Sequence, residues 1–153
     1  MHQKAPPPLT IYKSILRFAS DTITDLRSTT SATGLEYFAF DSRLEESELP
    51  RNDLIGISGW TFSDDGGGFI SIAFGLTVST ISDTNLMRES EIVSRLYEIA
   101  GVGDTIPVLN PTTGEQFNEL VITDFDIAPP GMSEIRNYRM VKFEALLGRA
   151  ANG

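Results

Sequence analysis

The chain has 153 residues, with 12 Lys and Arg against 21 Asp and Glu, a single His and no Cys. Without Cys there are no disulfides, Cys-ligated zinc sites, iron–sulfur clusters or thiol nucleophiles, and His2 at the N-terminus is a poor candidate for a Ser-His-Asp triad. The formal net charge of −9 argues against duplex DNA binding, which depends on clustered Lys and Arg.

The length is typical of one compact domain that builds its core without a metal or a disulfide. We expect residues 1–9 to be a flexible N-terminal tail, residues 10–147 a single α+β domain, and residues 148–153 a frayed C-terminal tail. The N-terminus has no apolar segment of a secretory signal, and no apolar run approaches the roughly 20 residues of a membrane-spanning helix. We therefore expect a soluble protein made in a cytoplasm.

The first element is an amphipathic helix predicted over residues 11–27, with Thr10 as its N-cap. Its apolar residues recur at steps of three and four: Tyr12, Ile15, Leu16, Ala19, Ile23 and Leu26. The small polar residues 28–34 predict a loop. Residues 35–40 are rich in strand formers and predict a short strand.

A charged connection follows over residues 41–53, with room for one helical turn before Pro50. Residues 54–62 predict a strand that carries Trp60 and Phe62 on one face. Residues 69–80 alternate apolar with small side chains and predict its partner strand. The glycine-rich segment 63–68 between them is typical of a hairpin, because glycine permits positive φ. A phosphate-binding loop would instead lead into a helix, so the hairpin is the favoured interpretation.

A second helix is predicted after a cap at Asp83 or Thr84, and it ends before Gly101. Its expected buried face consists of Leu86, Val93, Leu96, Tyr97 and Ala100. Its expected solvent side consists of Arg88, Glu89, Glu91, Arg95 and Glu98.

Residues 102–118 contain two Pro and two Gly and predict a long connection, with room for a small hairpin at residues 110–114. Residues 120–128 and 137–147 predict a final pair of antiparallel strands around a turn at 129–131. In the first strand we expect Val121, Phe125 and Ile127 to share a face opposite Asp124 and Asp126. In the second strand we expect one face with Val141, Phe143, Ala145 and Leu147 and the other with Tyr138, Met140, Lys142 and Glu144. In sum, the patterns predict an α+β fold, a mainly antiparallel β-sheet with two amphipathic helices packed on one face.

Two acidic pairs are the only candidates for chemistry. Asp124 with Asp126, and Asp64 with Asp65, could bind a hard cation or act as an acid–base pair. Alternating Asp on the wet face of an antiparallel sheet is the more ordinary interpretation. We therefore expect no catalytic, metal or cofactor site, and keep a small carboxylate-dependent metal enzyme as an alternative.

Two other features have open interpretations. Trp60, Phe62 and Phe69 flank the glycine-rich hairpin and either form a contact patch or close one end of the core. The small residues Ser71, Ala73, Gly75, Thr77 and Ser79 suit either close approach of another subunit or a solvent-facing strand.

The order of elements resembles the tail-terminator proteins of long-tailed bacteriophages. The similarity runs through the acidic, Pro-containing segment before residue 54, the passage from strand to helix over residues 68–100, and the last hairpin at residues 119–147. It implies a hexameric ring of α+β subunits that caps the tail tube, ends its polymerisation and joins the neck. Other phage structural parts, such as a head-completion or neck protein, a baseplate component or a tail-tube subunit, remain alternatives.

The implied partners are copies of the chain, the tail tube protein, a neck or connector protein and, as a further possibility, the tail sheath. The acidic charge would suit a lumen through which DNA passes without specific binding. Two projecting loops are the expected contact regions of the ring. Their candidate residues are Trp60, Phe62, Asp64, Asp65, Gly67, Phe69, Pro107, Asn110, Pro111 and Gly114.

Overall fold

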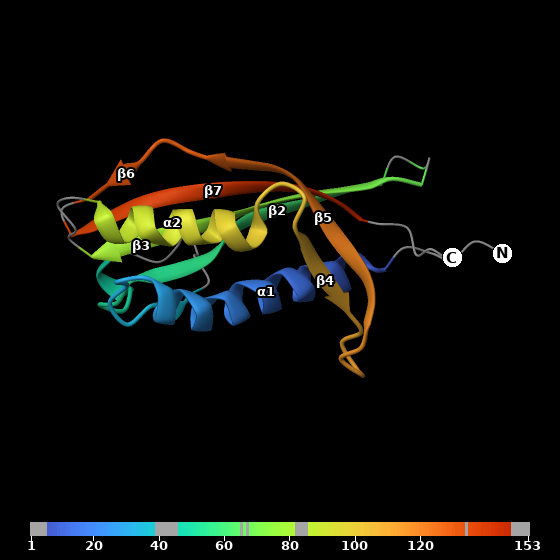
Figure 1. Cartoon of the computed structure of the whole chain (residues 1–153), viewed down its shortest axis with the longest axis horizontal. Helices are drawn as coiled ribbons and strands as arrows, with labels where there is room; N and C mark the ends of the chain where they lie inside the picture. Colours follow the sequence, from blue (N-terminus) through green and yellow to red (C-terminus); the bar gives the residue numbers. More distant parts are fainter. Residues whose placement is uncertain are drawn as a thin grey trace.

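A computed structural model describes residues 6–38, 46–64, 66, 68–81, 86–133 and 135–147 (Figure 1). The helices are α1 (Pro8–Thr29) and α2 (Met87–Ala100), with a short 3-10 helix, η1 (Glu46–Glu48). The strands are β1 (Glu36–Tyr37), β2 (Leu54–Asp64), β3 (Ile70–Ile81), β4 (Thr105–Leu109), β5 (Gln116–Ile127), β6 (Gly131–Met132) and β7 (Arg136–Leu147). The predicted α+β class, with two helices on one face of a mainly antiparallel sheet, is confirmed.

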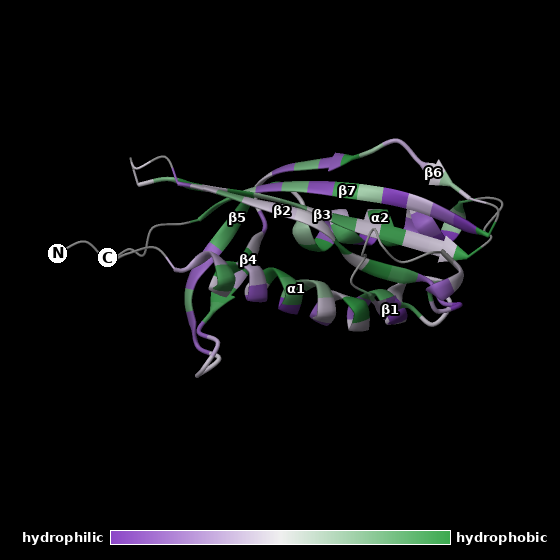
Figure 2. Ribbon diagram, turned by 180° about the vertical axis from the view of Figure 1, so that it is seen from behind, coloured by the Kyte–Doolittle hydropathy of each residue, from purple (hydrophilic) through white to green (hydrophobic). Residues whose placement is uncertain are grey.

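The strands form one sheet in the order β1-β2-β3-β7-β5-β4, and β6 extends it beside β7. All pairs are antiparallel except β1 with β2. Helix α1 contacts both β2 and β4, which lie near opposite edges of the sheet, so the sheet curls around this helix. Hydrophilic and hydrophobic residues alternate along β7 in Figure 2, as expected for a strand with one face on the core.

Helix α1 begins earlier than predicted. Pro8 is its first residue and Pro7 its N-cap, with no side-chain cap, so the prediction of Thr10 as the cap was wrong. Proline suits this position because its fixed φ matches the helix and its missing N–H needs no partner there. Pro8 and Leu9 therefore belong to the helix and not to a tail. The predicted apolar stripe is buried at Ile15, Ala19, Ile23 and Leu26.

The next segments follow the prediction in part. Strand β1 spans two residues, and Phe38 continues the pairing by donating its N–H to the Ile55 carbonyl at 2.9 Å. The end of the predicted strand, Ala39 and Phe40, lies outside the described residues. The expected helical turn before Pro50 is η1. The hairpin of β2 and β3 is confirmed, with a β-bulge between Ile57 and Gly59.

Helix α2 differs from its prediction on both faces. Val93, Leu96 and Ala100 are buried as expected, but Tyr97 is 59% exposed and Glu89 is 1% exposed. Tyr97 turns toward β5, where its ring meets Phe125, whereas Glu89 is buried because it has a cationic partner in the sheet, described below.

The N-cap of α2 is Leu86, with a φ of +54° and no side-chain cap, so the prediction of Asp83 or Thr84 as the cap was wrong; these two residues lie outside the described ones. Leu86 therefore precedes the helix and is only partly buried, and does not belong to a buried helix face as predicted.

Helix α2 ends before Gly101, as predicted, but the reason for glycine at this position is not a left-handed conformation. Gly101 follows the last helical residue, but its φ of −75° is not left-handed. A Cβ at Gly101 would lie 2.6 Å from the Tyr97 carbonyl oxygen. Close approach of backbone to backbone, and not positive φ, is what requires glycine here.

Residues 102–118 are not mainly a connection. They contain β4 and the start of β5, joined by a turn at residues 110–114 that confirms the small hairpin. Ile106 and Val108 are buried on β4, which packs against α1. The strand was missed because Pro107 lies between these two residues, and proline is accepted here because β4 is at the edge of the sheet.

A β-bulge in β5 alters the predicted alternation. Register shifts between Ile122 and Asp124, so Leu120 and Ile122 face the core before it and Phe125 faces the core after it. The prediction that Val121 shares a face with Phe125 was therefore wrong. The last strand, β7, buries Val141, Phe143, Ala145 and Leu147 on one face, as predicted.

The register places aromatic residues from four strands in one row across the sheet. In strand order the row consists of Trp60, Phe74, Phe143 and Phe125, each the cross-strand partner of the next. Phe143 stacks on Phe74 at a centroid distance of 4.8 Å and meets Phe125 edge to face at 5.2 Å. Tyr12 stacks on Trp60 at one end, and Tyr97 meets Phe125 at the other, so both helices are fixed to this row.

Candidate functional site

The two loop regions expected to make contacts are the tips of two hairpins. The β2–β3 tip and the β4–β5 tip both lie at the end of the molecule away from β6, one on each side of that end (Figures 1 and 2). The structure therefore brings both candidate regions to one end of the molecule, although they come from separate parts of the chain.

The β2–β3 tip has an ordered turn on one side. Asp64 pairs with Ile70 across the hairpin, and its carboxylate accepts a hydrogen bond from the Gly66 N–H at 2.9 Å. Gly66 has a φ of +74°, a left-handed conformation that glycine adopts without strain, and this explains the glycine in the turn. Phe69 is 62% exposed beside this turn. Asp65 and Gly67 lie outside the described residues.

Trp60 and Phe62 lie further down the hairpin and are half-buried. Both pack against the hydrophobic core, and Trp60 stacks on Tyr12 of α1 at 5.1 Å. The sequence left open whether these two residues form a contact patch or close one end of the core, and in the structure they close the core. The exposed aromatic residue of the hairpin is Phe69.

The β4–β5 tip is a compact turn held by Asn110. Its side-chain oxygen accepts hydrogen bonds from the N–H groups of Thr112 and Thr113, at 2.8 and 3.2 Å. Its carbonyl accepts the Gly114 N–H at 2.8 Å, where Gly114 has a φ of +75°. Pro111 is exposed at this tip. Pro107, expected in the same loop, is exposed on strand β4 instead, beside α1.

The acidic pair Asp124 and Asp126 is exposed on the face of β5 away from the helices. Their cross-strand partners on β7 are Glu144 and Lys142. Within the part of the chain that the structure describes, no group of three or more His, Cys, Asp or Glu side chains is arranged to hold a metal ion. Together with Glu119 and Glu144, the pair places four carboxylates against one cation, Lys142, on this part of the outer side of the sheet.

The small residues of β3 line a hollow on the same outer side. Ser71 and Ala73 line it together with Thr61 of β2 and Glu144 of β7, and its volume is about 380 Å³. Further along, Gly75 is buried, and a Cβ there would lie 2.6 Å from the Ser58 Oγ. The small side chains thus allow close packing inside the sheet, and Ser79 is fully buried as a partner of Arg136.

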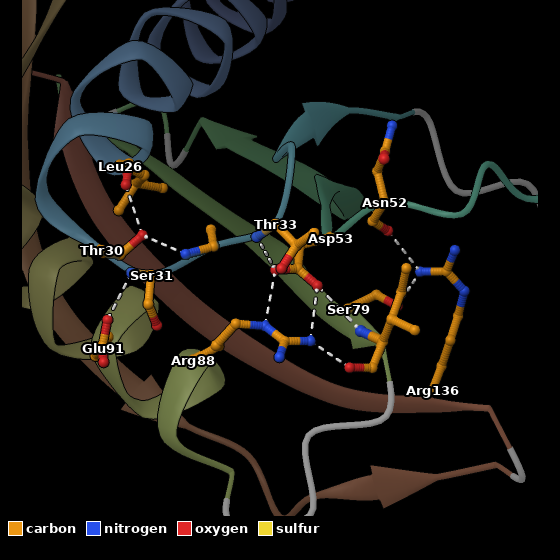
Figure 3. A network of polar contacts seen from close by, with 12 residues as sticks. Leu26, Thr30, Ser31, Thr33, Asn52, Asp53, Ser79, Arg88, Glu91 and Arg136 are labelled. Carbon is orange, nitrogen blue, oxygen red and sulfur yellow. Dashed lines mark hydrogen bonds and ion pairs between the residues drawn. The ribbon is translucent and has the colours of Figure 1, made fainter.

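A buried polar network was not predicted. Asp53 is fully buried directly before β2, and its carboxylate accepts hydrogen bonds from the N–H groups of Thr33 and Ile81 at 2.5 and 3.0 Å (Figure 3). Arg88 of α2 points at the same carboxylate, with Nε 3.1 Å from Oδ2. Asp53 therefore joins the loop after α1, the end of β3 and the start of α2. The only sequence signal was an acidic residue directly before a buried strand.

Two more buried charges stabilise the same end of the fold. Arg136 of β7 donates to the Asn52 carbonyl and the Ser79 hydroxyl, both at 3.0 Å (Figure 3). It also donates to the Pro50 carbonyl. Glu89 forms an ion pair with Arg139 at 2.7 Å. Arg136 thus satisfies buried carbonyl oxygens, and Arg139 bonds to Oε1 of Glu89, whereas the buried Oε2 of Glu89 has no hydrogen-bond partner among the described residues.

The two helices are joined by an ion pair at the surface. Arg95 of α2 donates two hydrogen bonds to the Asp25 carboxylate of α1, at 2.7 and 2.8 Å. These bonds lower the pKa of Asp25 below its ordinary value of 3.8. The pair therefore stabilises the fold fully above about pH 4, and this contribution is lost as the pH falls through the lowered pKa.

We expect Arg95→Gln to flatten the acid dependence of stability. Without the guanidinium, the pKa of Asp25 in the folded protein should return toward its ordinary value, so folding should no longer favour the carboxylate over the acid. Urea denaturation of both proteins from about pH 6 to about pH 3 measures the slope. Arg17→Gln is the control, because the ion pair of Arg17 with Asp21 is exposed and has a distance of 3.7 Å. An unchanged slope in Arg95→Gln would contradict the assignment.

None of the described helices is long and apolar enough to cross a membrane.

Comparison with known proteins gives no assignment for this chain. No protein-family model matches the sequence, and no curated protein matches it.

Proposed function

We propose that this protein is a structural subunit of the virion of a long-tailed bacteriophage, where it caps the tail tube as a ring, ends tube polymerisation and joins the head-side neck. The observation that carries the proposal is the placement of two hairpin tips at one end of the molecule (Figure 1). One tip offers the exposed Phe69 and the other the Asn110 turn with the exposed Pro111. A ring of such subunits would present a circle of tips to a neighbouring ring.

The distribution of charge supports a DNA-conducting ring. The outer side of the sheet carries four exposed acidic residues, Glu119, Asp124, Asp126 and Glu144, against the exposed Lys142 beside Asp126. Carboxylates lining a passage would repel DNA phosphates and let the genome slide without specific binding. The partners would be copies of the chain, the tail tube protein and a neck or connector protein, with the tail sheath in a contractile tail.

Electron microscopy of the purified protein tests this function. A tail terminator should form closed rings that bind the ends of assembled tail tubes and stop their growth. Long cylinders formed by the protein alone would instead identify a tube subunit. A protein that binds the head or the baseplate, and leaves tube length unchanged, would identify one of the other phage structural parts.

A deletion in the β2–β3 tip tests whether this tip is a contact region of the ring. Deleting residues 64–67 should abolish tube binding or ring formation and leave the fold intact, because it removes only the last pair of the hairpin, Asp64 with Ile70, and keeps the pairing of β2 with β3 up to Ser63 and Ser71. Shortening the opposite end at β6 is the control, because β6 contains only Gly131 and Met132, both exposed. Unimpaired capping by the tip deletion would argue against this contact region.

The enzyme alternative rests on Asp124 and Asp126 alone. Their carboxylates are exposed on one strand face, where they could hold a hard cation only weakly. Calorimetric titration with calcium, magnesium and manganese tests it. Heat of binding that Asp124→Asn removes would revive this alternative, and its absence would dispose of the metal-dependent version.

A further inference from the structure

The exposed side of α1 carries a row of residues spaced four apart. The row consists of Leu9, Lys13 and Arg17, which are all exposed, Leu9 at 60%. Successive members lie about 6 Å apart along the helix axis, because each residue advances it by about 1.5 Å. Lys13 and Arg17 are two positions to either side of the buried Ile15, so they point away from the core. Helix α1 therefore presents one apolar and two cationic side chains on the side opposite the sheet.

The outer side of the sheet carries an apolar and an acidic feature at a similar spacing. Leu146 of β7 is 37% exposed, and Glu144 lies on the same face with Asp124 of β5 as its cross-strand partner. Among the described residues, neither of these carboxylates is in an ion pair. Like charges directly opposite each other destabilise a sheet, and a cation placed between them offsets this repulsion. The hollow of about 380 Å³ that Glu144 and Leu146 help to line leaves room for a side chain from outside.

The two surfaces lie on opposite sides of the molecule and at the same level along it. Helix α1 and strand β7 both follow the long axis, on opposite sides in Figure 1. Tyr12, the neighbour of Lys13, stacks on Trp60 at 5.1 Å. The aromatic row then leads from Trp60 to Phe143, the neighbour of Glu144. Subunits stacked in the same orientation, helix side against outer sheet side, would therefore bring Lys13 to the level of Glu144 without a shift along the long axis.

Helix α1 runs antiparallel to β7. In its last turns, Arg27 donates to the Leu35 carbonyl at 2.6 Å. The cross-strand pairs that begin at the next residue, Glu36, lead across β2 and β3 to Tyr138 near the start of β7. The beginning of α1 is thus level with the second half of β7 and its end with the first half, as the colours in Figure 1 also show.

We propose that α1 of one subunit docks on the outer side of the sheet of the next. Lys13 lies between Glu144 and Asp124 of that sheet, where its ammonium group can donate to both carboxylates. Leu9 lies against Leu146. This contact rests on the ring proposed above and names the interface between its subunits.

The order and the spacing of the residues fit this contact. Leu9 precedes Lys13, and Leu146 follows Glu144, so the two apolar residues meet when the two elements run in opposite directions. Two residues of an antiparallel strand advance about 6.8 Å, against about 6 Å for one step of the row on α1. Both members of each pair can therefore meet at once.

The charges select a head-to-tail contact. A symmetric contact through two outer sides would bring Glu144 and Asp124 of both copies together, and one through two copies of α1 would bring their cations together. Like-charge juxtaposition disfavours both. A contact between two different patches is the kind that can close a ring. Glu119 and Asp126 of the outer side take no part in it and remain for the passage.

Charge reversal tests the contact. Lys13→Glu adds a carboxylate beside Glu144 and Asp124, and Glu144→Lys sets a cation against Lys13. Each variant should raise the dissociation constant between subunits at least about tenfold. Sedimentation velocity at low salt measures the oligomers. Arg51→Glu and Glu48→Lys are the controls, because they make the same changes at exposed positions before β2 and should assemble like the natural protein.

Mixing the two variants distinguishes this contact from general damage. In the mixture, the natural outer side of the Lys13→Glu protein can receive the natural α1 of the Glu144→Lys protein. In the other contact the two altered residues meet with opposite charges. Oligomers of the natural size should therefore return in the mixture, although neither variant forms them alone, and their return shows that both variants are folded.

The other outcomes overturn the proposal in different ways. Rings of the natural size formed by Lys13→Glu alone would refute this contact and leave the ring function standing. Loss of assembly in both variants, folded by circular dichroism, without recovery in the mixture would refute direct pairing of the two residues. A natural protein that is monomeric by light scattering would refute both the contact and the ring.

Discussion

Replacing Asp53 with Ala is expected to lower the free energy of unfolding by about 3–5 kcal/mol. The carboxylate is fully buried and accepts hydrogen bonds from two backbone N–H groups and from Arg88. Its removal leaves those N–H groups unpaired and the guanidinium, whose side chain is 22% exposed, without its anionic partner. Urea denaturation at neutral pH, monitored by circular dichroism, measures the loss.

Two further variants separate the charge from the hydrogen bonds. Asp53→Asn keeps the shape and one acceptor oxygen, so its loss should be smaller than that of the Ala variant. Asp21→Ala is the surface control, because its carboxylate is 73% exposed and lies 3.7 Å from Arg17, and it should cost less than about 1 kcal/mol. Equal losses in Asp53→Ala and Asp21→Ala would show that the buried network contributes nothing specific.

Phe143→Ala is expected to cost about 3–5 kcal/mol of stability, chiefly through a cavity in the core. Phe143 is 1% exposed and lies inside the aromatic row, between Phe74 and Phe125. The truncation would remove two ring contacts and leave a space that the flanking strands of the same sheet can close only in part. Thermal and urea denaturation of the variant provide the measurement.

The matched control is Phe117→Ala on β5. Phe117 is 44% exposed, and the same change in side-chain volume there should cost about 0.5 kcal/mol or less. If the Phe143 variant lost less than about 1 kcal/mol, the core would have to be repacking around the gap, contrary to a row fixed by strand register.

Segments with a long and regular hydrophobic period were predicted well. The stripe of α1, the alternation of β3 and the alternation of β7 each repeat over several turns or residue pairs, and each was found buried as expected. Errors occurred where a single residue interrupts or shifts the alternation of apolar and polar side chains. The bulge after Ile122 moved Val121 off the face of Phe125, and Pro107 concealed the alternation of Ile106 and Val108 in β4.

Charged residues were the second source of error. Glu89 was expected in solvent because it is charged, and it is buried because Arg139, 50 residues away in the chain, reaches its carboxylate at 2.7 Å. The burial of Asp53 was not predicted for the same reason, since its hydrogen-bond partners come from residues 33, 81 and 88. A local pattern carries no information on whether a distant partner will offset the cost of burying a charge.

The candidate contact residues also divide into features that local sequence determines and features that depend on the tertiary structure. Turn chemistry placed Asp64, Asn110 and Gly114 correctly at hairpin tips, because Gly, Asn and Asp act on their own neighbouring backbone. Whether the two tips share an end of the molecule, and whether Trp60 is exposed, depends on how the sheet curls around α1.

The sequence by itself determined an acidic α+β chain without cysteine, with two amphipathic helices, two glycine- or proline-marked hairpins and a final strand pair, because composition and period are local properties. Only the tertiary structure decided which strands lie at open edges, and that Trp60 and Phe125 lie at one level of the sheet. The physical reason is that register between strands distant in the chain is fixed jointly, by the bulges in β2 and β5 and by the helices packed against one face.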